Sequence, residues 1–258
     1  MKILNKTLLC TAIAAVSAPA SAAIIYKDVA YGADAATAES AFLADTYNRV
    51  TEGFEGFNPS AAQDADGDGY QAFVANEPQK SWVLAQESFS TSVGTFSLTS
   101  SQSAEGDDVE PEKLMIEDSE SGEFGRENLG KWLDSNDALS VKWNIMDGEA
   151  GKRNAIGFYL SDANDINASL KLEFEDGSVS DDIEIASPLS NSNIAYITIF
   201  SDIFFDKAYL TFNNGEGTND GWGIDNVSVA RVPEPGTLAL LGLGLAALGL
   251  GRSRKIKH

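Results

Sequence analysis

Cysteine and histidine are almost absent from this chain of 258 residues, which has only Cys10 and His258, each close to one end. If both ends are lost on maturation, the domain between them has no thiol and no imidazole. This composition excludes Ser-His-Asp and Cys-His catalysis, zinc sites built on His or Cys, and disulfides. Glycoside hydrolysis by two carboxylates stays open, because it needs only Asp and Glu.

Basic residues are also scarce: Lys and Arg number 18 against 39 Asp and Glu, so the formal net charge is −21. Six of the basic residues but only one acid, Glu234, lie in the two ends, which leaves residues 23–231 with a charge near −26. That charge disfavours binding to nucleic acid and to anionic membrane surfaces. It suits solubility in saline surroundings or the binding of divalent cations.

The first 22 residues have the order of a secretory signal peptide. Lys2 and Lys6 give a basic start, residues 7–16 are apolar, and Ala20-Ser21-Ala22 provides small residues for cleavage. We therefore expect export through the inner membrane and cleavage between Ala22 and Ala23, which also removes Cys10.

The C-terminal end has three parts in order. Val232-Pro233-Glu234-Pro235 comes first, residues 237–250 contain only Thr, Leu, Ala and Gly, and four Lys or Arg residues follow before His258. At about 1.5 Å per residue the apolar part would span about 21 Å as a helix, less than the roughly 30 Å of a hydrocarbon core. Such a span suits transient retention, with the basic end in the cytoplasm.

This three-part tail resembles the PEP-CTERM sorting signal of Gram-negative bacteria. The residues that carry the resemblance are Val232, Pro233, Glu234 and Pro235, the Gly/Leu/Ala segment and the basic end. The resemblance implies processing by exosortase, a membrane cysteine transpeptidase, and co-occurrence with exopolysaccharide production. It implies a place in the cell envelope, on the cell surface or in the extracellular matrix, with membrane contact only through the tail.

Between the two ends the sequence consists mostly of short β-prone runs, after one helix candidate at residues 33–48. Polar and apolar residues alternate at 139–145 and 170–174, and Asp176-Gly177 is a favoured hairpin turn. Residues 100–122 are polar and acidic and are expected to form a long surface loop. The other strand candidates are residues 50–57, 82–89, 93–98, 154–160, 178–185, 194–200, 204–212 and 223–230.

These runs predict a mainly β fold, a single β-sandwich or jelly-roll-like domain over residues 23–231 with one N-terminal helix. Residues 1–22 are the expected signal peptide. Residues 232–258 are the expected sorting tail with its short transmembrane helix.

An Asp-rich loop is the clearest metal-site candidate. Asp64, Asp66 and Asp68 alternate as the first ligands of an EF-hand do, Gly69 permits the sharp turn, and Tyr70 would offer its carbonyl. The twelfth position is Ala75 in place of Glu, so an authentic EF-hand is not expected. A looser calcium loop and a solvated acidic turn both remain open.

Two further segments, residues 130–137 and 221–229, resemble signature segments of PEP-CTERM surface proteins with a jelly-roll body. That resemblance implies a structural calcium before the last strand, with Asp225 and Asn226 as ligands and Asp220 nearby. The alternative is turn chemistry, since Asp and Asn hydrogen-bond loop backbones well.

Trp132 and Trp222 lie beside glycines, where exposed indoles could stack on sugars; packing in the core is the alternative. The function favoured by the sequence is a non-enzymatic, calcium-stabilised surface or matrix protein associated with exopolysaccharide. A carboxylate-dependent glycosidase or polysaccharide lyase and a structural adhesin are the alternatives.

Overall fold

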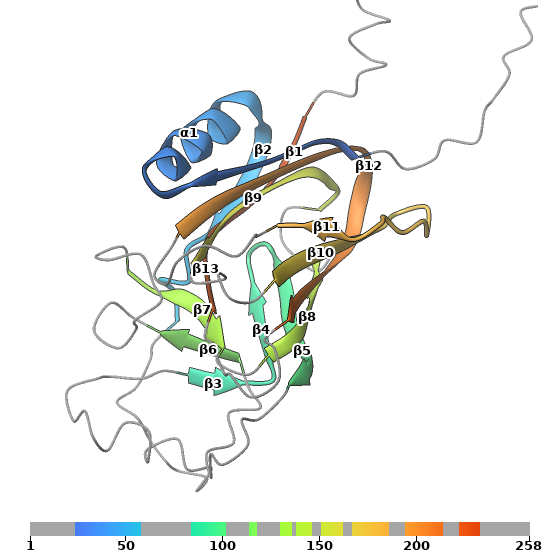
Figure 1. Cartoon of the computed structure of the whole chain (residues 1–258). Coiled ribbons are helices and arrows are strands. Elements are labelled where there is room, and N and C mark those ends of the chain that lie inside the picture. The colour runs from blue at the N-terminus through green and yellow to red at the C-terminus, as the bar shows by residue number, and fades with distance from the viewer. Residues whose placement is uncertain are drawn as a thin grey trace, which may run out of the picture.

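The computed structural model describes residues 24–57, 84–101, 114–117, 130–135, 138–145, 151–161, 167–185, 194–213 and 222–232 (Figure 1). Within these ranges the chain is mainly β, with one α-helix, α1 (Ala35–Asp45), preceded by a short 3-10 turn, η1 (Gly32–Asp34). The strands are β1 (Ile24–Tyr31), β2 (Tyr47–Glu52), β3 (Leu84–Gln86), β4 (Ser88–Thr91), β5 (Gly94–Ser101), β6 (Leu114–Glu117), β7 (Trp132–Ser135), β8 (Ala138–Asn144), β9 (Arg153–Ser161), β10 (Asn167–Phe174), β11 (Ile183–Glu184), β12 (Ile194–Asn213) and β13 (Trp222–Arg231).

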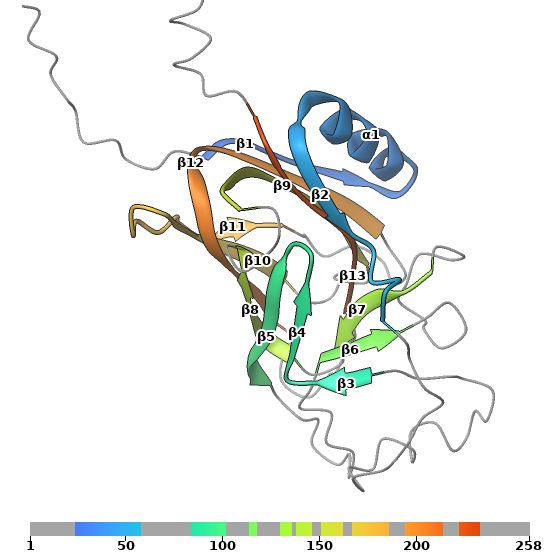
Figure 2. The same cartoon turned by 180° about the vertical axis from the view of Figure 1, so that it is seen from behind.

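One long strand, β12, belongs to both halves of an antiparallel sheet. Its first part pairs with β1 on one side and β9 on the other, and β9 pairs in turn with β13. Its second part pairs with β10 and β8, and β8 continues to β5 and β4. The sheet therefore folds over on itself, and its two halves face each other across the core (Figures 1 and 2).

The main core lies between these two halves. The inward residues include Ile156 and Phe158 of β9 from one half, and Leu170 of β10 and Trp143 of β8 from the other, all at most 1% exposed. Stacked rings fill the space, with centroids 5.1 Å apart for Phe96 and Trp143. This confirms the prediction of a mainly β, sandwich-like domain.

A second, smaller core lies on the outer side of the first half, under α1 (Figure 2). Phe42 of the helix packs against Tyr159 of β9 and Tyr196 of β12, which explains why every residue of β9 is buried: one face meets the main core and the other meets the helix. The helix itself ends earlier than predicted, at Asp45, because the chain turns into β2 at Tyr47.

Several strands differ from the sequence predictions. Residues 194–200 and 204–212 were expected to be two strands. They belong to one strand, β12, which stays hydrogen-bonded throughout while its partners change along its length. The loop predicted at residues 100–122 contains β6, whose Leu114, Met115 and Ile116 are fully buried, so that prediction was wrong there. Strands β1 and β7 were not predicted at all.

The Asp176-Gly177 turn is confirmed. Gly177 has a φ of 81°, and the residues on either side pair as Glu173 with Val179 and as Leu170 with Ile183. None of the helices in the described ranges has the length and apolar character needed to cross a membrane.

Gly157 should be the glycine least tolerant of a side chain in the helix–sheet contact. A Cβ there would lie 2.4 Å from the Tyr196 hydroxyl and 2.9 Å from a ring carbon of Phe42. We expect Gly157→Ala to destabilise the fold by about 1–3 kcal/mol, because buried rings must shift. Gly56→Ala is the control, since a Cβ at Gly56 meets nothing within 4 Å. Thermal unfolding of both variants checks this, and equal melting temperatures would contradict the close packing.

Candidate functional site

The outward side chains of β10, β12, β8, β5 and β4 form a continuous polar surface, which we call the outer polar face. The register places them in rows, because directly paired residues of antiparallel strands point to the same side. One row runs Lys171, Tyr209, Lys142, Ser97 and Ser88, and the next runs Glu173, Lys207, Asn144, Thr95 and Ser90. All ten are partly or fully exposed.

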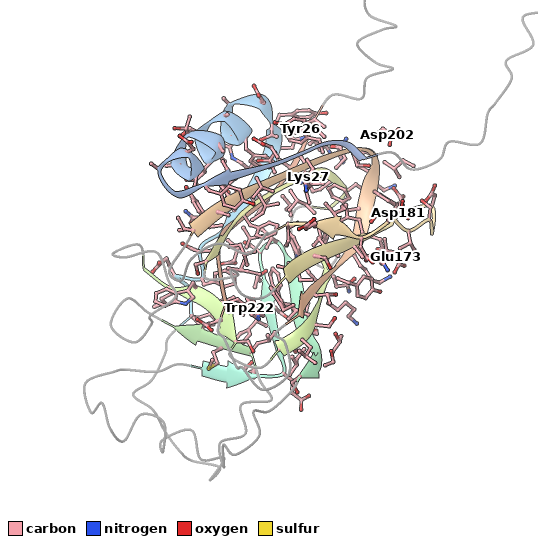
Figure 3. The ribbon with its side chains drawn as sticks, in the orientation of Figure 1. Tyr26, Lys27, Glu173, Asp181, Asp202 and Trp222 are labelled. Atoms are coloured by element: carbon pink, nitrogen blue, oxygen red, sulfur yellow. The ribbon has the colours of Figure 1, made fainter. Side chains whose placement is uncertain are left out.

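Hydrogen bonds fix the part of the outer polar face that lies on β10 and β12. Lys207 donates to Glu173 and to Asp206, with a distance of 2.8 Å to each carboxylate oxygen, and the hydroxyl of Tyr209 donates to the second oxygen of Glu173 at 3.1 Å. Bonds to Asp206 and Glu173 raise the pKa of Lys207 above its usual range. Burial, followed by the hydrogen bond to Glu173, raises the pKa of Tyr209. These hydrogen bonds hold the ring of Tyr209 in one position. Glu173 (Figure 3) uses one carboxylate oxygen to bind Lys207 and the other to bind Tyr209.

The lysines of this face differ in their partners. Lys171 reaches Asp182 at 3.1 Å, and Lys207 has the two carboxylates given above. Lys142 stands between Tyr209 and Ser97 in its row and has no ion pair within the described residues. An ammonium group has three donors that an acceptor can bond.

Asp225 and Asn226 lie at a β-bulge in β13. Asp225 pairs with Tyr159 and Ser228 with Gly157, so two residues of β13 oppose the single Phe158 of β9. The extra residue changes which positions point inward, and Asn226 adopts a φ of 47°. The sequence gives no repeat or spacing that reveals this bulge.

The polar contacts at the bulge connect the sheet to α1. The amide of Asn226 donates to Glu39 at 3.3 Å, and Tyr159 donates to the other oxygen of Glu39 at 2.7 Å. Asp225 is 6% exposed and accepts from the backbone N–H of Asn226 at 2.6 Å. Within the described ranges no three His, Cys, Asp or Glu side chains gather as a metal site would need. A calcium ion held by Asp225 and Asn226 remains a prediction.

The other predicted site residues lie outside the described ranges. They are Ala22 and Ala23 at the signal cleavage point, Asp64, Asp66, Asp68, Tyr70 and Asp220 among the metal ligands, and Pro233, Glu234 and Pro235 of the sorting motif.

The prediction that Trp132 and Trp222 are exposed sugar platforms is wrong. Trp132 is 3% exposed and its indole N–H donates to Asp134 at 3.0 Å. Trp222 is fully buried and stacks on Phe212 with centroids 4.1 Å apart (Figure 3). Both residues begin strands instead of lying in turns, so their rings enter the protein and present no free face to a sugar.

Val232, the first residue of the predicted sorting motif, is hydrogen-bonded to the body. The side chain of Asn154 accepts from the Val232 N–H at 2.9 Å and donates to the Ser201 carbonyl at 3.0 Å. Asn154 is 1% exposed, so this contact is well shielded. The next residue, Pro233, has no N–H to continue such pairing. Val232, the last described residue, is thus both fixed to the body and the first residue of the predicted motif.

Solved structures similar to this chain include family 29 carbohydrate-binding modules. A mutant of the module CBM29-2 is 15% identical, with 60% of this chain and 87% of that chain covered and a TM-score of 0.28. A mutant of the same module complexed with cellulohexaose is 13% identical over 72% of this chain and 98% of that chain, also with a TM-score of 0.28. A comparison with curated proteins finds no match.

A family model does match the end of the chain. Residues 231–255 match the PEP-CTERM protein-sorting motif, which confirms the resemblance drawn from Val232-Pro233-Glu234-Pro235, the apolar segment and the basic end. The match begins at Arg231, the last residue of β13. A mainly β body thus leads directly into this motif, and the chain is a protein that carries a PEP-CTERM sorting domain.

Proposed function

We propose that this chain is a non-catalytic protein of the cell surface or extracellular matrix that exosortase sorts and that binds extracellular polysaccharide. The observation that carries the proposal is the sorting motif at residues 231–255. The motif implies secretion and delivery to the cell envelope. Since PEP-CTERM signals co-occur with exopolysaccharide production, polysaccharide is the ligand class that such a protein meets after export.

The outer polar face supplies a surface of the right chemistry for this ligand. Sugars offer hydroxyl groups that both donate and accept, and Ser, Thr, Asn and Lys side chains along two rows match them. Tyr209 lies between Lys171 and Lys142 in one row, and an aromatic ring held in place gives apolar contact for the C–H side of a pyranose at little entropic cost. Lys142 beside it can make a charge-assisted hydrogen bond to a hydroxyl or an acidic sugar.

Catalysis is not part of the proposal. The acids nearest Tyr209 are Glu173 and Asp206, and both accept hydrogen bonds from Lys207. This arrangement positions the Tyr209 ring. Because both carboxylates accept hydrogen bonds from a lysine ammonium group, neither is placed to donate a proton to a glycosidic oxygen. Serine- and cysteine-based mechanisms that require histidine are excluded for the body by composition.

Replacing Tyr209 should weaken polysaccharide binding. We expect Tyr209→Ala to lower affinity for the exopolysaccharide of the producing cell by about 5–30-fold, as central aromatic contacts contribute about 1–2 kcal/mol. Lys142→Gln should lower it less. Tyr47→Ala is the matched control, because Tyr47 is 47% exposed on β2, away from this face.

Affinity measured by calorimetry or by retention on immobilised polysaccharide checks this prediction. Equal loss in Tyr209→Ala and Tyr47→Ala, or no binding by the parent chain, would contradict the assignment of the outer polar face. Release of reducing ends from the polysaccharide would contradict the non-catalytic proposal.

We also propose that calcium stabilises the protein, through the Asp64–Tyr70 loop and through Asp220, Asp225 and Asn226. The support is the excess of acids over bases and the alternation of Asp64, Asp66 and Asp68. Oxygen ligands of this kind suit a hard cation, whereas His and Cys ligands are missing from the body.

Calcium removal therefore has an expected result. The full chain in a non-ionic detergent should melt several degrees lower in EDTA than in millimolar calcium, because a ligand bound only by the native state raises its stability. Replacing Asp64, Asp66 and Asp68 together by Asn should abolish most of the difference if the loop is the stronger site. Asp225→Asn tests the bulge in the same way. Identical melting curves with and without calcium would contradict the proposal that these seven residues bind calcium.

A further inference from the structure

Two arginines at one end of the sheet share a single hydrogen-bond acceptor. Arg153 begins β9 and donates from Nη1 to the carbonyl oxygen of Lys152 at 2.8 Å. Arg231 ends β13 and donates from Nε to the same oxygen at 2.9 Å. Two guanidinium groups are thus held close together, although the chain as a whole has about twice as many acids as bases.

Neither guanidinium has an acidic partner within the described residues. Arg153 is only 7% exposed, and its buried Nε–H finds no acceptor there. Burial, followed by the charge of Arg231, lowers the pKa of Arg153. Within the described ranges, Glu175 is the one carboxylate that forms an ion pair in this cluster, and its partner is Lys152.

Two cations of the cluster also lie over the aromatic ring of Phe204. The guanidinium of Arg231 lies 5.2 Å from the ring centroid of Phe204, and the ammonium of Lys152 lies 5.9 Å from it. A cation–π contact orients these cations but does not neutralise them. The charge of Arg153 and Arg231 is therefore uncompensated in the described structure.

Such a pair is the arrangement that an oxyanion would stabilise. A buried or half-buried cation without a partner is costly, and two like charges in contact add to that cost. A phosphate or carboxylate group can accept hydrogen bonds from the N–H groups of two guanidinium groups at once and neutralise both charges. Arg153 is buried whereas Arg231 is partly exposed, so Arg231 is the member of the pair that a ligand can reach, and the ligand must bring acceptor oxygens with negative charge to offset both cations.

The position of the pair indicates where the oxyanion comes from. Ile24, the first described residue after the predicted signal peptide, pairs with Ser201, and the Ser201 carbonyl accepts from Asn154 beside Arg153. Val232 is bound to the same Asn154. The start of β1 and the end of β13 therefore lie at this end of the body (Figure 2), and in sequence these are the described neighbours of the two predicted membrane-directed segments.

The length of chain that follows Arg231 limits its distance from the membrane. The apolar segment of the tail begins at Thr237, six residues later. Six residues span at most about 21 Å when fully extended. While the tail is inserted, Arg231 must stay within that distance of the bilayer surface, although the acidic body as a whole is repelled by an anionic membrane.

We propose that Arg153 and Arg231 form an oxyanion site that binds the phosphate of a phospholipid head group and so holds this end of the body against the membrane until the tail is processed. The choice of lipid as the source rests on the proposed sorting function; the oxyanion site itself rests only on the geometry of the two arginines.

The test is thermal unfolding of the full chain in a non-ionic detergent at constant ionic strength. Inorganic phosphate, and separately phosphatidylglycerol added to the micelles, should each raise the melting temperature by several degrees. Diacylglycerol at the same mole fraction lacks the phosphate and should not raise it. Arg231→Gln should abolish both increases, and Arg231→Lys, which loses the fork, should reduce them. Lys27→Gln removes the same charge from β1, where the Lys27 ammonium donates to the Glu184 carbonyl, and should respond as the parent chain does.

Each other outcome overturns part of the proposal in a defined way. No response to phosphate, or a response that survives in Arg231→Gln, shows that the arginine pair is not an oxyanion site. A response to inorganic phosphate but not to phosphatidylglycerol rejects the lipid as source. A response to a uronic-acid oligosaccharide alone shows that the arginine pair binds an acidic polysaccharide and not a lipid phosphate. Loss of polysaccharide binding in Tyr209→Ala tests a different surface, so the two proposals fail separately.

Discussion

The structure depends on one strand that hydrogen-bonds along its whole length while its partners change. Strand β12 pairs first with β1 and β9 and then with β10 and β8, so it joins the two halves of the sheet without a break. The main core exists because this continuity lets the two halves face each other. Both proposed sites follow from the same strand: the outer polar face covers its second part, and the end of the body from which the tail leaves lies beside its first part, near Ser201.

The sequence predicted those elements whose signal is local. Alternation at 139–145 and 170–174 and the Asp176-Gly177 turn gave β8, β10 and the hairpin correctly, because one face of each strand is buried and the other is not. Strand β9 was also predicted, from its apolar run, although it is buried on both faces. Strand β6 was missed because only Leu114, Met115 and Ile116 mark it within a long polar tract. The bulge at Asn226 was missed because a change of inward-facing positions depends on pairing with β9.

The candidate sites divide in the same way. The sorting motif is a contiguous pattern, so Val232-Pro233-Glu234-Pro235 and the segments after it were sufficient to predict it. Exposure of Trp132 and Trp222 depends on tertiary packing, and neighbouring glycines gave the wrong answer. The outer polar face and the Arg153–Arg231 pair join residues from distant strands, and only the register of those strands brings them together.

The central claim is that a folded β body is exported and then processed at a motif that begins where the body ends. Intact-mass measurement of the protein recovered from cells with and without exosortase tests it most directly. The account predicts that the signal peptide is missing in both cases and that residues C-terminal to a point within 231–255 are missing only when exosortase is present. The same C-terminal mass in both cells would contradict the sorting function on which the account rests.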